Sequence, residues 1–175
     1  MLNLFLPTKH VNDFLAITPE ILKKEGKKGV IIDLDNTLVP WNVNEATPEV
    51  KDWLQKMKDH DIKVIIFSNN NKERVTIFAE PLDTPYVYYA RKPLKRGFKK
   101  AIDILDLNKE DVVVIGDQLL TDILGGNRAG IDTILVVPIV ESDAKITQFN
   151  RKMERRILNH FYRKGKLVRR DVNNE

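Results

Sequence analysis

Short apolar runs alternate along the chain with longer segments in which apolar residues recur every three or four positions. The short runs have the length of buried strands, and the recurring positions have the spacing of one helical face. Their alternation predicts a parallel sheet covered by helices on both faces, an α/β doubly wound fold. Strands are expected over residues 29–33, 62–67, 86–90, 111–116 and 131–137.

Capping residues mark where the helices between these strands begin and end. Thr47-Pro48-Glu49 combines an N-cap threonine, a proline in the first turn and an acidic residue near the helix N-terminus. Thr18-Pro19-Glu20 repeats this pattern, and Gly130 has the position of a C-cap glycine. Helices are predicted after Thr18 and over residues 47–57, 72–79, 94–105 and 119–129.

Composition narrows the candidate chemistry. The chain has 175 residues, of which 42% are hydrophobic and 31% charged, as expected of one globular domain with terminal extensions. It has no cysteine, which excludes disulfides, zinc–thiolate sites and thiol nucleophiles. Its histidines, at positions 10, 60 and 160, lack the spacing of metal ligands. Carboxylates are therefore the candidate catalytic groups.

The apolar segments are too short for a membrane span. The longest run, residues 134–140, has the length of a strand and contains Pro138. The amino-terminal residues lack a basic segment and a small-residue cleavage site, so a signal peptide is not expected. The sequence predicts a cytoplasmic protein that does not span a membrane.

Positive charge is concentrated near the carboxyl end. The net charge is +4, but residues 151–170 hold nine lysines and arginines against one acidic residue, so the rest of the chain is acidic. Apolar residues recur in the same region at helical spacing, at positions 146, 149, 153, 157 and 161. We expect an amino-terminal helical lead-in (1–28), a core (29–140) and a basic amphipathic carboxyl-terminal helix and tail (141–175).

The carboxyl-terminal helix has three interpretations from sequence. It can pack on the sheet and leave a solvated basic face. It can bind an anionic lipid surface, which places the protein at the inner face of a membrane without spanning it. The basic residues 151–170 can also contact a nucleic acid or a protein partner. The sequence leaves all three open.

Polar residues follow each of the first four predicted strands. Because the carboxyl ends of parallel strands lie at one edge of the sheet, where ligands bind in folds of this kind, these residues are expected to line one crevice. They are Asp33 and Asp35 after the first strand, Ser68 and Asn69 after the second, Arg91 and Lys92 after the third, and Asp117 after the fourth.

Asp33 and Asp35 lie two residues apart at a strand end, where both carboxylates can face one bound group. Thr37 adds a hydroxyl and a backbone donor for an anion. The same residues also have a purely structural interpretation, in which aspartate and asparagine satisfy backbone groups at a strand-to-turn exit.

Asp117 and Asp122 add two carboxylates at another strand end. Oxygen ligands in this number suit Mg²⁺. The structural alternative is that Asp122 caps a helix and Asp117 is a loop acid. Carboxylates that converge on one crevice repel one another, so the arrangement requires cations. A divalent metal ion and Lys92 would supply them.

In order and spacing, these residues resemble the four motifs of the haloacid dehalogenase (HAD) superfamily. The motifs are Asp33-Leu-Asp-Asn-Thr37, Ser68 after a strand, Lys92 before a helix, and Gly116-Asp117 with Asp122, within residues 29–137. Three segments look more narrowly like the YqeG-type subgroup of subfamily IIIA, which is similar to phosphatidylglycerophosphate phosphatases. These segments are residues 18–22, 34–39 and 116–122. The resemblance implies a HAD-like sheet with a Rossmann-type core.

The resemblance also implies a phosphatase and a role for each residue. Asp33 would be the nucleophile that forms an aspartyl-phosphate. Asp35 would be the general acid for the leaving oxygen and then the base that activates water. The phosphate would be bound by Thr37, Ser68, Asn69 and Lys92. The Mg²⁺ ligands would be Asp33, Asp35 through its carbonyl oxygen, Asp117 and Asp122.

HAD enzymes often have a cap domain inserted after the first or second motif. Here one helix and one strand fill each interval between motifs, so no cap domain is expected. An open crevice favours a bulky substrate, such as a phospholipid headgroup phosphate like that of phosphatidylglycerophosphate. The alternatives are a nucleic-acid or protein phosphate, transfer to an acceptor other than water, and a low-turnover binding module for a protein or RNA partner.

Overall fold

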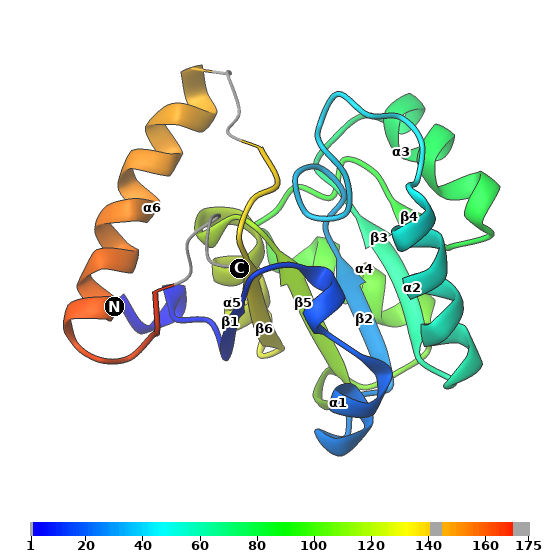
Figure 1. Ribbon diagram of the computed structural model, residues 1–175, viewed down its shortest axis with the longest axis horizontal. Coiled ribbons are helices and arrows are strands. Elements are labelled where there is room, and N and C mark those ends of the chain that lie inside the picture. Colours follow the sequence, from blue (N-terminus) through cyan, green and yellow to red (C-terminus); the bar gives the residue numbers. More distant parts are fainter. Residues whose placement is uncertain (1, 141–144, 170–175) are drawn as a thin grey trace.

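A computed structural model describes residues 2–140 and 145–169, apart from the side chains of residues 145–149. Six parallel strands form one sheet in the order β1-β6-β5-β2-β3-β4 (Figure 1). The strands are β1 (Lys9–Val11), β2 (Gly29–Ile32), β3 (Lys63–Phe67), β4 (Tyr86–Val87), β5 (Val112–Gly116) and β6 (Asp132–Val136). The α/β doubly wound fold expected from the sequence is confirmed.

Helices cover both faces of this sheet. They are α1 (Pro19–Lys24), α2 (Pro48–Asp59), α3 (Lys72–Ala79), α4 (Lys95–Leu105), α5 (Leu124–Ala129) and α6 (Lys145–Arg163). One face packs on α2 and α3 through a core that includes Trp53, and the other packs on α4 through Phe98. Ile31 of β2 faces the α4 side, and its neighbours Val30 and Ile32 face the α2 side, as the alternation of a strand requires.

Two elements differ in detail from the sequence-based prediction. The strand expected over 86–90 is only two residues long, because Tyr89 and Arg91 adopt the left-handed backbone conformation, with φ of 45° and 56°. The helix expected over 119–129 begins as a π-helix, η5 (Leu119–Ile123), and continues as α5.

The amino-terminal segment, expected to be helical, also contributes a strand. β1 pairs in parallel with β6, and Lys9 lies opposite Ile134. Its three residues are too few and too mixed in polarity to give the sequence pattern of a strand. β1 thus belongs to the same sheet as the core strands, and the division of the chain at residues 28 and 140 stays a prediction.

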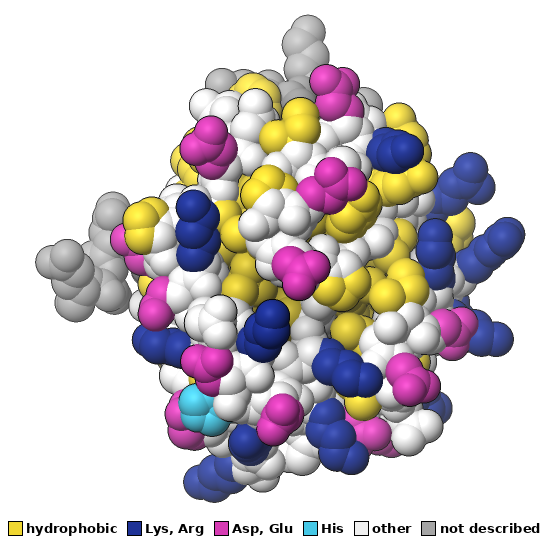
Figure 2. Space-filling view, turned by 90° about the vertical axis from the view of Figure 1, so that its right-hand side faces the viewer, with side chains coloured by type: hydrophobic (Ala, Val, Ile, Leu, Met, Phe, Trp, Pro, Cys, Tyr) yellow, Lys and Arg dark blue, Asp and Glu magenta, His cyan; other side chains and the backbone are white. Residues whose placement is uncertain are grey.

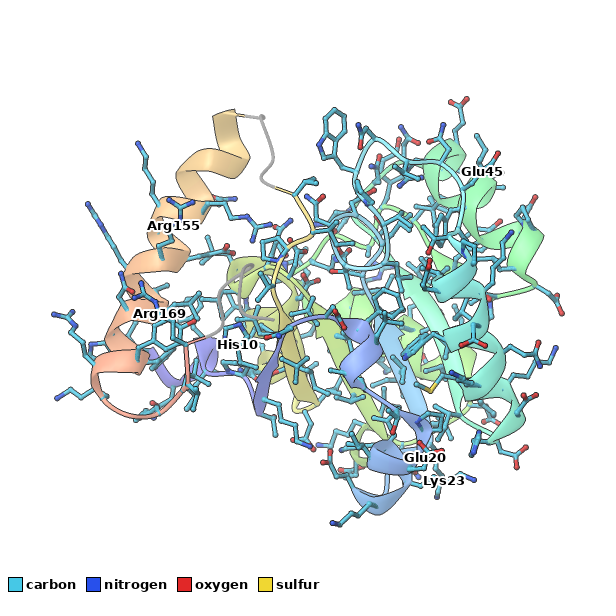
Figure 3. All side chains as sticks on the ribbon, in the orientation of Figure 1. His10, Glu20, Lys23, Glu45, Arg155 and Arg169 are labelled. Atoms are coloured by element: carbon cyan, nitrogen blue, oxygen red, sulfur yellow. The ribbon has the colours of Figure 1, made fainter. Side chains whose placement is uncertain are left out.

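The parallel strands bring their carboxyl ends to one edge of the sheet. Figure 3 shows α1, marked by Glu20 and Lys23, at one end of the strands and the loop that bears Glu45 at the other. The strand order reverses at β2, whose neighbours are β3 and β5, so the ligand crevice of such a sheet opens beside β2. Every residue from 33 to 92 is described, and no cap domain interrupts them.

α6 packs against η5 and β6 through Ile157 and Leu158. Phe161 is buried, whereas Met153, which was predicted to lie on the apolar side, is exposed. The apolar positions 146 and 149 lie outside the described side chains. Among the described residues, none of the helices combines the length and apolar character of a membrane span.

Figure 2 shows the side of the molecule that lies opposite α6, near β4. Acidic and basic side chains are interspersed on this side.

Candidate active site

Three carboxylates meet where β2 and β5 end. Asp33 directly follows β2, Asp117 directly follows β5, and Asp122 lies in η5. β2 and β5 are hydrogen-bonded neighbours in the sheet, so their ends are adjacent. All three aspartates are buried, and one carboxylate oxygen of each lies within 4.8 Å of the others. The structure therefore brings together three carboxylates from two motifs that are far apart in the sequence.

The approach of Asp122 to this cluster depends on Gly116. A Cβ atom at Gly116 would lie 2.3 Å from Cγ of Asp122, so any side chain there would displace the carboxylate. Asp122 Oδ2 also accepts a hydrogen bond from the backbone N–H of Gln118 at 3.2 Å. Asp122 therefore accepts a local backbone hydrogen bond, as the structural alternative from sequence expects of a capping residue. Its carboxylate nevertheless also belongs to the cluster.

Lys92 lies among these carboxylates. Its Nζ is 2.5 Å from Asp33 Oδ1 and 2.7 Å from Asp122 Oδ1, and the side chain is 3% exposed. Asn69 holds the lysine backbone, because its Oδ1 accepts the N–H of Lys92 at 2.7 Å and its amide donates to the Lys92 carbonyl at 3.3 Å. This contact positions the lysine, and the role of Asn69 as a phosphate ligand stays a prediction.

Two hydroxyls complete the buried part of the site. The Thr37 hydroxyl lies 3.4 Å from Asp33 Oδ2 and 3.3 Å from Asp117 Oδ1, within reach of both carboxylates. Ser68 is buried, and its Oγ accepts a hydrogen bond from the backbone N–H of Asn70 at 3.0 Å. Both hydroxyls therefore lie at the carboxyl edge of the sheet, as the sequence predicts.

Burial sets the protonation behaviour of the cluster. Burial raises the pKa of Asp33 and of Asp122, although the nearby ammonium of Lys92 opposes the shift. Burial also raises the pKa of Asp117 to about 6, against the opposing effect of Arg151. Burial alone would lower the pKa of Lys92, but the carboxylates of Asp122 and Asp33 outweigh it and raise that pKa. A positive charge thus stays fixed among the carboxylates.

Asp35 lies apart from the three clustered carboxylates. Its Oδ1 accepts hydrogen bonds from Arg74 at 3.0 and 3.1 Å, and its Oδ2 accepts one from the Asn70 amide at 3.1 Å. Arg74 comes from the first turn of α3 and Asn70 from the loop before it. Neither partner was expected from the sequence, because nothing in the local pattern around residues 70–74 indicates a contact with Asp35.

Arg151 of α6 is a further site residue that was not expected from the sequence. Its guanidinium forms an ion pair with Asp117 Oδ2, donates to the Asp117 backbone carbonyl at 2.9 Å and contacts Glu154 Oε2 at 3.2 Å. Glu154 is buried, and burial raises its pKa to about 7. In the sequence, Arg151 is one of many basic residues of the tail. The only signal that could have singled it out is Glu154, the one acidic residue within residues 151–170.

The charges of the site fit a divalent cation. Four carboxylates, those of Asp33, Asp117, Asp122 and Glu154, face two fixed cations. The carboxylates therefore exceed the cations by two negative charges when all are ionised. Oxygen ligands and this excess suit a hard divalent metal ion. Asp33, Asp117 and Asp122 could hold such an ion.

The sequence matches the haloacid dehalogenase-like hydrolases over residues 41–130. It is 56% identical to "Probable phosphatase YqeG" of Bacillus subtilis (strain 168), over 93% of this chain and 95% of that protein. It is 29% identical to "Phosphatidylglycerophosphate phosphatase 1, chloroplastic/mitochondrial" of Arabidopsis thaliana, over 91% of this chain and 49% of that protein.

Among the solved structures similar to this chain is one that matches over most of its length. It comes from Thermotoga maritima and is assigned as a beta-phosphoglucomutase. The similarity covers 78% of this chain and 99% of that chain, with a TM-score of 0.53 and 16% sequence identity. Because the sequence identity is low, this similarity shows a shared fold and carries no information on activity.

Proposed function

Because this chain is a phosphatase of the haloacid dehalogenase-like hydrolase family, we propose that it hydrolyses phosphate monoesters through an aspartyl-phosphate on Asp33. The observation that carries this proposal is the cluster of three buried carboxylates beside Lys92. A nucleophile needs a fixed position and a nearby positive charge to attract the phosphoryl group. Asp33 has both, from the end of β2 and from Lys92.

The proposed reaction has two steps. In the first, a carboxylate oxygen of Asp33 bonds to phosphorus, the bond from phosphorus to the leaving oxygen breaks, and Asp35 gives that oxygen a proton. In the second, water attacks phosphorus, Asp35 takes the proton from water, and the bond to Asp33 breaks. Inorganic phosphate leaves, and both aspartates return to their starting states. Asp35 is 20% exposed and lies outside the buried cluster, so its carboxyl group is accessible to both substrate and water.

We propose Mg²⁺ as the metal ion, held by Asp33, Asp117 and Asp122, with the carbonyl oxygen of Asp35 as a further ligand. When bound, the ion would supply positive charge against the oxygens of the transferring phosphoryl group. Lys92 would also bind this group, and Ser68 and Thr37 would donate hydrogen bonds to it. In this proposal Asn69 positions Lys92 through its hydrogen bonds to the Lys92 backbone, and its side-chain amide also donates a hydrogen bond to the phosphate.

The nucleophile is tested by Asp33→Asn. We expect metal-dependent hydrolysis of an aryl phosphate to fall to the background rate, because the amide cannot form the acyl phosphate. The matched control is Asp103→Asn on the exposed side of α4, which makes the same chemical change away from the site. Wild-type activity in Asp33→Asn would contradict the proposal.

We further propose that the substrate is a lipid headgroup phosphate. Large exposed apolar side chains lie in the segments that follow β2, β4 and β6 at the carboxyl edge of the sheet. Two of these residues are hydrogen-bonded through their backbone to Asn36, which lies between Asp35 and Thr37. Asn36 Oδ1 accepts the backbone N–H of Trp41 at 3.3 Å, and the Asn36 backbone carbonyl accepts the backbone N–H of Ile139 at 3.0 Å. We call this set the apolar rim; it consists of Trp41, Tyr88, Tyr89, Leu94 and Ile139.

The apolar rim and the relatives support a substrate at a lipid surface. Tryptophan and tyrosine suit the boundary between water and acyl chains, because one end of each ring is polar. The exposed lysines and arginines of α6 would add attraction to an anionic surface. The Arabidopsis relative is named for a lipid phosphate. In this proposal the protein works in the cytoplasm at the inner face of a membrane, without spanning it.

Activity on three substrate classes tests this proposal. We expect faster hydrolysis of an anionic lipid phosphate in vesicles than of nucleotide or sugar phosphates. Trp41→Ser and Leu94→Ser should lower the rate on vesicles more than the rate on a soluble aryl phosphate. Ile104→Ser removes an equally exposed apolar side chain from α4 and is the matched control. Equal activity on all three classes, or preference for a nucleic-acid or protein phosphate, would contradict the lipid assignment.

A further inference from the structure

α6 contacts both chain segments that carry the clustered carboxylates from β5 and η5. Arg151 binds the side chain and the backbone carbonyl of Asp117. One turn further along α6, Glu154 Oε1 accepts the backbone N–H of Leu120, in η5, at 3.1 Å. η5 also carries Asp122. The carboxyl-terminal helix therefore reaches the site at two points, although the family resemblance lies within residues 29–137.

Arg151 and Glu154 are held to each other as well as to the site. They lie three residues apart on α6, so both side chains project from one face of the helix. Arg151 Nη1 contacts Glu154 Oε2 at 3.2 Å, while Glu154 Oε1 is occupied by Leu120. Both oxygens of the glutamate are thus used, and the guanidinium is fixed in a single orientation. Its planar group of donors can bind the backbone and the carboxylate of Asp117 together.

The two oxygens of Asp117 have different surroundings. Arg151 occupies Oδ2, whereas Oδ1 lies 3.3 Å from the Thr37 hydroxyl. That hydroxyl is also 3.4 Å from Asp33 Oδ2. Oδ1 of Asp117 and Oδ2 of Asp33 therefore point toward the same place. Arg151 holds the outer oxygen of Asp117 and leaves the inner one directed at Asp33.

We propose that α6 completes the metal site, with Arg151 as a positioning residue that presents Asp117 Oδ1 to the cation and Glu154 as the residue that orients Arg151. This inference rests on the proposed function, because it assumes that a cation binds between Asp33 and Asp117. It gives the carboxyl-terminal helix a role within the reaction centre, separate from any role of its exposed basic side chains.

Charge and geometry predict opposite effects of removing Arg151. If the arginine only neutralised charge, its loss would make the site more negative and tighten cation binding. If it positions Asp117, its loss frees the carboxylate and weakens binding. Residues that orient metal ligands typically change metal affinity or activity by about 10–100-fold when they are replaced. The direction of the change therefore separates the two roles.

The test is a titration of the full-length protein with Mn²⁺, followed by electron paramagnetic resonance. We expect Arg151→Gln to weaken Mn²⁺ binding by roughly 10–100-fold. Arg151→Lys should also weaken it, because the single ammonium nitrogen cannot take the places of the two guanidinium nitrogens that make these contacts. Glu154→Gln should give a smaller loss in the same direction. Lys152→Gln is the matched control, since Lys152 is the exposed neighbour on the same helix and the charge change is identical.

Circular dichroism should show that each variant keeps the helical content of the parent. If Arg151→Gln proves unfolded, Arg151→Lys and Glu154→Gln carry the test. Unchanged or tighter Mn²⁺ binding in a folded Arg151 variant, or full affinity in Arg151→Lys, would overturn the positioning role. For hydrolysis, excess metal should restore much of kcat in Arg151→Gln, as a defect in metal binding requires.

The outcome is distinguishable from a failure of the proposed function. The Mn²⁺ titration reads the site without turnover, whereas the proposed reaction is tested by hydrolysis in Asp33→Asn. Weak Mn²⁺ binding in Arg151→Gln together with active Asp33→Asn would sustain the positioning role and remove the nucleophile. Inactive Asp33→Asn together with unchanged Mn²⁺ binding in Arg151→Gln would support Asp33 as the nucleophile and overturn the positioning role of Arg151.

Discussion

The site contains two groups of charges that differ in their contact with solvent. The inner cluster consists of Asp33, Asp117, Asp122 and Lys92, whose side chains are 0–7% exposed. The outer pair consists of Asp35, 20% exposed, and Arg74. Both groups join carboxylates to a cation, yet only the inner cluster has more carboxylates than its cations balance. The outer pair is one carboxylate and one guanidinium.

This difference indicates what each group is for. Buried ion clusters are often replaceable by apolar residues with a neutral or stabilising effect of about 1–4 kcal/mol, so stability alone gives no reason to keep one. An excess of buried negative charge instead suits a cation that is added later. A balanced pair at the edge of the crevice costs less to maintain, and a carboxylate there can exchange protons. The comparison separates a metal and phosphate centre from a proton-transfer group.

The largest expected effect is that of Lys92→Met, which breaks the inner cluster. Removing one partner of a buried ion pair costs about 3–5 kcal/mol, and here two carboxylates lose their partner. We expect a large loss of unfolding free energy in urea and loss of hydrolysis. Lys99→Met on the exposed side of α4 is the control. Wild-type stability in Lys92→Met would show that the inner charges are not coupled as described.

The next largest effect is expected in the outer pair. Asp35→Asn should lower kcat by roughly 10²–10⁴-fold, the usual contribution of a general acid and base. Mn²⁺ affinity should stay near that of the parent, because the Asp35 carboxylate lies outside the buried cluster and its carbonyl is retained. An equal loss of metal affinity and turnover would show that the Asp35 carboxylate takes part in metal binding, and would contradict the separation of the outer pair from the inner cluster.

The smallest effect is a pH dependence of the metal-free protein. Burial raises the pKa of Asp117 to about 6 and of Glu154 to about 7, and also raises that of Asp33. The folded state therefore binds protons more tightly than the unfolded chain, and stability should increase as pH falls through this range. We expect the Tm without metal to be a few degrees higher at about pH 5 than at about pH 8.

Added Mg²⁺ should reverse this trend, because a metal ion binds the ionised carboxylates. The increase in Tm on adding Mg²⁺ should be larger at about pH 8 than at about pH 5. Differential scanning calorimetry in both buffers measures the two slopes. A metal-free Tm that rises with pH over this interval would contradict the pKa shifts assigned to the inner cluster.

Much of the fold and most of the inner cluster could be predicted from sequence. The strands β2, β3, β5 and β6 each contain a run of three or four consecutive apolar residues. Parallel strands bring the polar residues at their carboxyl ends together. The sequence therefore predicts that Asp33, Asp117 and Lys92 meet at one edge of the sheet. The resemblance to HAD phosphatases, carried by the same residues, is confirmed by the family match and the YqeG relative.

The contacts missed from sequence all join elements distant in the chain. Arg151 lies 34 residues beyond Asp117, and Arg74 lies 39 beyond Asp35. Local patterns of charge indicate helix faces and caps. The lone acidic residue Glu154 could single out Arg151 among the basic residues of the tail, but it does not indicate which element Arg151 contacts. β1 was missed for a related reason, because a three-residue edge strand is defined by its partner β6 more than by its own composition.

The most direct test of the account is to locate the phosphoryl group. Asp35→Asn protein is mixed with Mg²⁺ and an aryl phosphate, quenched in acid, digested and analysed by mass spectrometry. We predict the mass of one phosphoryl group on the peptide that contains Asp33, and its absence when Asp33 is also replaced by asparagine. A phosphoryl group on another residue, or hydrolysis that persists with Asp33 replaced, would contradict the central claim.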